Sequence, residues 1–333
     1  NKHKHEGGYT MFRDGLTPVI KLYGEIINRF YHQYRKSGRP FIYSQISFLL
    51  FFMAMVIKKI HKFKAMARYA KEHYPDFGFP NAPSRQTIRR RFISLPELIQ
   101  RLLPFSLEEL RDIDERFSNK TGFIDKCLFW AKGPRWHKKY MLENIIPFKS
   151  IDTEASWGYS PYHKWVFGYG VHLICNEFRF PLAASVTTAK VYEAKQVPFL
   201  LKYLKELVLL IGDKGYRLLP LIKNTFETFK VFIISSKAFK GYINQFKKDY
   251  AFIISLEYAK RLYRKRISTI EPLFSLIKEL FGLSRKKPLP YKSLAKNRAY
   301  LLTLVFTVQF MFVFNSINNK NLNSISYFKG QFL

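Results

Sequence analysis

The chain has 333 residues, 47% of them hydrophobic, which is enough to bury a sizeable core in one large domain or two ordinary ones. Its 56 Lys and Arg outnumber 24 Asp and Glu, so the formal charge is +32. This composition excludes a disordered tail and favours a polyanionic partner, because a soluble protein of that charge repels itself. AT-rich coding would also inflate the lysine content, but it does not explain arginine clusters such as Arg89-Arg90-Arg91.

Two apolar windows, Ile46–Ile57 and Tyr300–Phe314, fall short of the roughly twenty uninterrupted residues that cross a bilayer. We therefore expect buried helices and no membrane. The segment Asn1–Glu6 lacks the apolar stretch of a signal peptide. Cys127 and Cys175 form neither a CxxC pair nor a disulfide framework. These features favour the prokaryotic cytoplasm, and a DNA-bound protein there would be associated with the nucleoid.

Apolar residues recur at helical spacing through most of residues 1–115. Within this region, a Pro-rich turn ends in Ser84, a good N-cap, immediately before a basic segment. A capped helix that exposes Arg85 and Arg89 is typical of the recognition helix in a helix-turn-helix. An ordinary solvated basic helix fits the same pattern. We predict a helical DNA-binding region over 1–115, with a candidate helix-turn-helix near 80–95.

From about residue 120 the pattern changes to short β-branched and aromatic runs of strand length. The expected strands are Thr121–Trp130, Trp165–Cys175, Phe178–Thr187, Leu207–Ile211 and Lys230–Ile234. Asn176-Glu177 joins the second and third runs, which suggests a hairpin. The fourth run is continuously apolar, as in strands that are buried on both faces.

Helices are expected between and after these strands, at Tyr192–Glu206, Leu256–Phe281 and Ser293–Phe314. Strands that precede helices around a central buried strand predict an α/β domain of ribonuclease-H-like type, with a mixed sheet flanked by helices. We place this catalytic domain at residues 118–316, followed by a basic and polar tail at 317–333.

Three acidic residues stand where this arrangement predicts a site. Asp125 lies in the first strand, Asp213 follows the buried strand at the edge where open α/β sheets bind ligands, and Glu271 lies in the long helix. Cleavage or transfer of a phosphodiester uses two metal ions about 3.5–4 Å apart, and Mg²⁺ prefers oxygen ligands. Taken singly, each residue fits a surface acid in an ion pair. Together, they predict a catalytic site for Mg²⁺, with Mn²⁺ as a substitute.

Two further residues bear on this site. Asp152 is an alternative to Asp125 as the first acid, but it lies in a loop well before the next strand, so we favour Asp125. Glu271 and Lys278 point the same way about two turns apart on one helix. The carboxylate is suited to a metal ion and the ammonium to a DNA phosphate. A histidine on an apolar strand, such as His172, is more often a core residue than a ligand.

At these residues the chain resembles the insertion-sequence transposases with a DDE domain, which belong to the ribonuclease-H-like and retroviral-integrase superfamily. The matching segments are Asp125, Ala131–Lys139, Ile151–Ser160, Trp165–Leu173, Gly212–Tyr216, and Ile270-Glu271 with Phe274 and Lys278. The chain departs from the family where Lys126 follows the first Asp. It also departs where four residues, not three, separate Arg266 from Glu271.

The resemblance implies that Asp125, Asp213 and Glu271 form a metal-binding triad and that Lys278 and Arg266 contact DNA. It further implies a transposase that cuts double-stranded DNA at terminal inverted repeats and joins the ends to target DNA, acting as a homodimer. Two alternatives stay open. One is a decayed transposase that only binds DNA, and the other is a structure-specific nuclease that uses the same two-metal chemistry.

Overall fold

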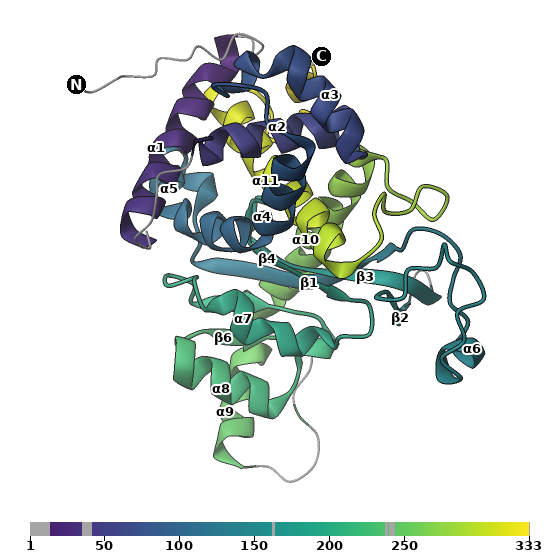
Figure 1. Ribbon diagram of the computed structural model, residues 1–333. Helices are drawn as coiled ribbons and strands as arrows, with labels where there is room; N and C mark the ends of the chain where they lie inside the picture. Colours follow the sequence, from purple (N-terminus) through teal and green to yellow (C-terminus); the bar gives the residue numbers. More distant parts are fainter. Residues whose placement is uncertain (1–13, 35–41, 162–163, 237–238, 240–243, 333) are drawn as a thin grey trace. The chain divides into compact units, whose positions relative to one another are not determined.

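The computed structural model describes residues 14–34, 42–161, 164–236, 239 and 244–332. The chain divides into two compact units (Figure 1). The helical unit comprises residues 1–113, 280–282 and 295–333, and the sheet unit comprises residues 114–279 and 283–294. The N-terminal segment Asn1–Glu6, where no signal peptide is expected, lies outside the described residues.

The helical unit confirms the expected helices of the first third of the chain. Its α-helices are α1 (Thr17–Tyr34), α2 (Gln45–Ile57), α3 (Phe63–His73), α4 (Arg85–Phe105), α5 (Leu107–Ile113), α11 (Leu294–Ile317) and α12 (Ile325–Lys329). Both apolar windows form buried helices, because α2 and α11 have no polar face. α2 buries 12 of its 13 residues and α11 buries 18 of its 24. Among the described residues, α11 alone is long and apolar enough to cross a membrane, and 89% of its most apolar window is buried.

The C-terminal end of the chain belongs to the helical unit from residue 295 onward, whereas we predicted a catalytic domain that extends to residue 316. Nearly all of α11 belongs to the helical unit, where Tyr23 of α1 packs on Phe306 and Phe310 at centroid distances of 5.4 and 5.1 Å. The predicted tail 317–333 contains α12, whose buried Phe328 contacts Phe310. A helix without a polar face needs apolar partners on all sides, and the other helices supply them.

The sheet unit is a mixed sheet flanked by helices, as predicted. Its strands are β1 (Thr121–Trp130), β2 (Ser156–Ser160), β3 (Lys164–Cys175), β4 (Pro181–Thr188), β5 (Leu209–Ile211) and β6 (Phe232–Ile234). They are ordered β2-β3-β1-β5-β6, with β4 also paired to β3. The strands β2, β1 and β4 run antiparallel to β3, whereas β5 is parallel to β1 and β6 is parallel to β5. The predicted hairpin at Asn176 is confirmed, and β2 is an additional strand.

Five α-helices belong to the described part of the sheet unit, and Figure 1 shows α7, α8 and α9 below the strands and α6 at the end of a loop. They are α6 (Lys138–Leu142), α7 (Val197–Leu201), α8 (Leu219–Phe229), α9 (Gln245–Ser255) and α10 (Glu257–Phe281). α7 contacts β4 and α8 contacts β6, while Tyr250 of α9 packs on Phe232 of β6 at 5.7 Å. The helix expected at 192–206 is shorter, because a 3-10 turn at Glu193–Gln196 precedes α7.

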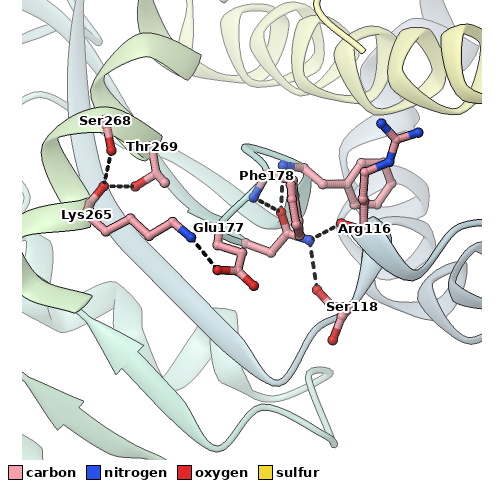
Figure 2. A network of polar contacts seen from close by, with 9 residues as sticks. Arg116, Ser118, Glu177, Phe178, Lys265, Ser268 and Thr269 are labelled. Carbon is pink, nitrogen blue, oxygen red and sulfur yellow. Dashed lines mark hydrogen bonds and ion pairs between the residues drawn. The ribbon is translucent and has the colours of Figure 1, made fainter. Parts of the chain in front are cut away.

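The turn between β3 and β4 holds α10 in place (Figure 2). Asn176 donates to two carbonyl oxygens of the segment before β1 and accepts two backbone N–H groups of its own turn. On this rigid turn, Glu177 forms an ion pair with Lys265 of α10. Arg179 donates to the carbonyl oxygen of Ser268 at 3.2 Å. These contacts fix α10 against the sheet close to Glu271.

Candidate active site

Asp125 and Asp213 lie on neighbouring parallel strands. Each stands two residues beyond the paired residues Phe123 of β1 and Ile211 of β5, so the register brings them to the same part of the sheet. The Asp125 carboxylate accepts the Lys126 N–H at 2.7 Å. Asp213 caps a 3-10 turn and accepts the N–H of the residue two positions later at 2.7 Å. The predicted position of Asp213, just past a buried strand, is therefore observed.

Glu271 reaches the same region through an arginine. Arg266 lies 3.3 Å from Oδ2 of Asp125 and 3.4 Å from Oε1 of Glu271, and only 13% of its side chain is exposed. The guanidinium therefore bridges the two carboxylates. The DNA contact predicted for Arg266 competes with these ion pairs in the arrangement described.

Negative charges around Asp125 repel one another. Burial raises the pKa of Asp125 to about 6, with smaller contributions from Asp213 and Glu271, against the lowering effect of Arg266. Glu193, which the sequence analysis did not single out, belongs to the same group. Burial, Asp213 and Asp125 raise its pKa to about 7. The scarcity of acidic residues was the one signal in the sequence that could have drawn attention to Glu193.

The carboxylates supply the hard oxygen donors that Mg²⁺ prefers. However, within the described ranges no three Asp, Glu, His or Cys side chains are placed to hold one metal ion. The guanidinium of Arg266 lies between Asp125 and Glu271 in that arrangement. The donors fit a divalent cation in kind, and a cation that binds both residues has to replace the guanidinium.

Asp152 and His172 have structural surroundings. Asp152 is 2% exposed and accepts the Tyr169 hydroxyl at 2.8 Å and the Ser293 N–H at 3.2 Å. These partners account for its burial without a metal ion. His172 is fully buried beside Thr187 at 2.8 Å, and burial lowers its pKa to about 3. His172 is therefore a core residue, as the sequence analysis favoured.

Lys278 lies at the rim of a cavity of about 220 Å³ between β1 and the loop that follows α10. Its ammonium is 5.6 Å from the ring centroid of Phe129 and lowers the pKa of the Cys127 thiol, against the larger raising effect of burial. Arg285 and Lys287 line the same cavity. Three cations thus gather beside the strand that carries Asp125.

The predicted recognition helix begins where expected. Ser84 caps α4 and accepts the Thr87 N–H at 3.2 Å, and Arg85 and Arg89 on its first turns are exposed. The helix is longer than predicted and runs to Phe105 without a break. Both arginines are exposed at the N-terminal end of this helix.

Comparisons with known proteins bear on the family of this chain. No curated protein sequence matches the chain. A crystal structure described as a pre-cleavage Mos1 transpososome is similar, with 11% identity, a TM-score of 0.22 and coverage of 82% of this chain and 79% of that one. The family profile described as "Transposase DDE domain" matches residues 135–310, which include Asp213 and Glu271. Because this match spans more than half of the chain, the protein belongs to the family with a transposase DDE domain.

Proposed function

We propose that the protein is a DNA transposase that cuts the ends of an insertion sequence and transfers them into target DNA. The observation that carries the proposal is the arginine bridge between Asp125 and Glu271, with Asp213 close to Asp125, in a chain whose residues 135–310 match the transposase DDE domain. Three separate elements supply these carboxylates. The net charge of +32 suits a DNA substrate.

The three carboxylates are the proposed ligands of Mg²⁺, with Mn²⁺ as a substitute. When bound, such ions activate the attacking oxygen and stabilise the leaving oxygen of a phosphodiester. Asp125 and Asp213 hold fixed positions, because their strands are paired and each accepts a backbone N–H group. Glu271, 45% exposed on α10, is the ligand most open to solvent and to DNA.

The strand order supports a ribonuclease-H-like core. Apart from β2, the sheet has the spatial order β4-β3-β1-β5-β6, in which three antiparallel strands are followed by two strands parallel to the first. The acids then lie on β1, directly after β5, and on the last long helix of the unit. This is the distribution expected from the resemblance to the DDE transposases.

The proposed DNA contacts come from both units. In the sheet unit, Lys278 shares its cavity with Arg285 and Lys287, and these cations would neutralise phosphates beside the acidic site. In the helical unit, Arg85 and Arg89 are exposed at the start of α4 and are proposed to contact the terminal inverted repeats. Pairing two element ends implies a homodimer in the DNA complex, in the nucleoid of a prokaryotic cell.

The test is cleavage of a labelled duplex that carries the terminal inverted repeats, with Mg²⁺, Mn²⁺ or EDTA. Wild type should nick the duplex with either metal and not with EDTA. Glu271→Gln should lose the activity while still binding the duplex. Glu279→Gln is the matched control, because Glu279 is an exposed carboxylate about two turns further along the same helix. Equal nicking by the Glu271 variant would reject the assignment.

One observation favours a second candidate, a transposase that binds DNA but no longer cuts it. Arg266 occupies the space between Asp125 and Glu271, and its spacing to Glu271 departs from the family pattern. A wild type that binds the inverted repeats tightly and nicks with neither metal would support this candidate. A Mn²⁺-dependent nick that Asp213→Ala abolishes would exclude it.

A further inference from the structure

The side chain of Glu193 lies next to Gly215, close to the carboxylate of Asp213. A Cβ atom added to Gly215 would lie 1.8 Å from Oε1 of Glu193 and 3.0 Å from Oδ1 of Asp213. The two carboxylate oxygens therefore lie within about 5 Å of each other, where like charges interact strongly. Any other residue at position 215 would displace the Glu193 carboxylate, so glycine is required for this close approach.

Two polar contacts hold the segment that carries Glu193. The Lys126 ammonium donates to the carbonyl oxygens of Ala189 and Val191 at 2.8 and 2.7 Å, which ties this segment to β1 next to Asp125. In addition, the hydroxyl of Tyr192, the residue before Glu193, donates to the carbonyl oxygen of Gly215 at 2.6 Å. Glu193 is therefore positioned by β1 and by the turn after β5, the two elements that position Asp125 and Asp213.

A buried hydroxyl near these acids is an independent sign of a ligand. Tyr216 is fully buried, and its hydroxyl has no hydrogen-bond partner within the part of the chain that the structure describes. Its ring packs against Gly212, where an added Cβ would be 2.7 Å from the ring. Its backbone N–H donates to the carbonyl oxygen of Asp213 at 3.2 Å, so the residue belongs to the turn that carries this acid. Burial raises the pKa of its hydroxyl, and the charges of Glu193, Asp125 and Asp213 act in the same direction. Buried hydroxyls nearly always have a partner, and a hydrated ion among the acids would provide one.

We propose that Glu193 is a fourth carboxylate of the metal site. A hydrated divalent cation would draw it together with Asp125 and Asp213, because these side chains are not placed to hold one ion in the arrangement described. Lys126 is the positioning residue of the Glu193 segment, and the Tyr216 hydroxyl finds its partner in the hydration shell of the cation. Mg²⁺ keeps several waters in protein sites, which suits a buried hydroxyl of this kind. The inference rests on the proposed function, because it extends the same site.

Direct metal binding tests the proposal without any DNA. Mn²⁺ binding by the full chain is measured by titration calorimetry, and the melting temperature is measured with and without Mn²⁺. We expect Glu193→Gln to weaken Mn²⁺ binding about tenfold or more. Without metal, the same variant should melt at an equal or higher temperature, because it removes a charge from a group of like charges. Glu227→Gln is the control, since Glu227 is exposed on α8 in the same unit.

The outcomes separate this inference from the proposed function. Mn²⁺ binding that Asp213→Asn weakens but Glu193→Gln leaves unchanged would overturn the role of Glu193 and retain the proposed site. A wild type that binds no Mn²⁺ would overturn both. A lower melting temperature of Glu193→Gln without metal, with unchanged Mn²⁺ binding, would show that Glu193 serves only the fold.

Discussion

The sheet unit contains two acidic regions, one around Asp125 and one around Asp152, and the two carboxylates have opposite surroundings. Asp152 is more deeply buried than Asp125, but a hydroxyl and backbone N–H groups surround its carboxylate. Asp125 has one backbone N–H and one arginine, and other carboxylates lie around it. Burial alone therefore does not identify a functional acid. The useful sign is a carboxylate whose neighbours are of the same charge, since a fold has no need to create that repulsion.

The largest effects are expected from substitution of the two aspartates. Loss of Asp125 should remove activity, whereas loss of Asp152 should lower stability. Asp125→Asn should abolish metal-dependent nicking and change the free energy of unfolding by at most about 1 kcal/mol, because relief of repulsion offsets a lost ion pair. Asp152→Ala should cost about 3 kcal/mol, because the Ser293 N–H loses its acceptor and Tyr169 loses one hydrogen bond.

Tryptophan fluorescence during urea unfolding measures this difference, because all four tryptophans lie in the sheet unit. Nicking by each variant is measured under conditions in which it stays folded. An Asp125→Asn protein that unfolds as easily as Asp152→Ala would mean that both aspartates serve the fold. Retained nicking in Asp125→Asn would move the first acid of the site elsewhere.

The positions of the acids in the Asp125 region could largely be predicted from the sequence, because they depend on local sequence patterns. Asp125 and Asp213 follow from strand patterns, because a short β-branched run with one acid at its centre or end has few other readings. Asn176-Glu177 predicted the β3–β4 hairpin in the same way, although the turn is longer than two residues, because β4 begins at Pro181 and not at Phe178.

Other features depend on contacts between distant residues and left no local pattern. The ion pair of Arg266 with Asp125 joins residues 141 positions apart, and the sequence analysis assigned Arg266 to DNA instead of to an ion pair. Glu193 lies in a 3-10 turn that helical periodicity merged with α7. β2 is a five-residue strand within a stretch of Gly and Ser, which reads as a loop until β3 pairs with it.

The acidity of the Asp125 region gives a smaller test. The pKa values of Asp125 and Glu193 are raised, to about 6 and about 7, so the folded state binds protons more tightly than the unfolded state. The resulting stability is fully present below the unfolded pKa values of about 4 and is lost as the pH rises through 6 to 7. We expect the sheet unit to lose about 1–2 kcal/mol between pH 5 and pH 8.

Urea unfolding followed by tryptophan fluorescence at several pH values measures this loss. Glu193→Gln should flatten the dependence, whereas Glu227→Gln should follow wild type, since Glu227 is exposed on α8. Stability that rises between pH 5 and pH 8 would contradict the assignment of repelling charges to the Asp125 region.

The smallest expected effect concerns DNA, and it uses a lysine from each acidic region. Lys278 lies near Cys127 of β1, the strand that carries Asp125. Lys292 precedes Ser293, whose N–H donates to Asp152. The Lys292 ammonium donates to the carbonyl oxygen of Lys149 at 2.9 Å. If DNA approaches the Asp125 region, Lys278→Ala should weaken binding of the inverted-repeat duplex. The slope of log affinity against log salt should fall by about one, the value for one lost phosphate contact. Lys292→Ala should leave that slope unchanged, because its ammonium already serves the fold. Equal slopes for both variants, measured by fluorescence anisotropy over a range of salt, would remove Lys278 from the DNA interface and leave the cations of its cavity without a proposed role.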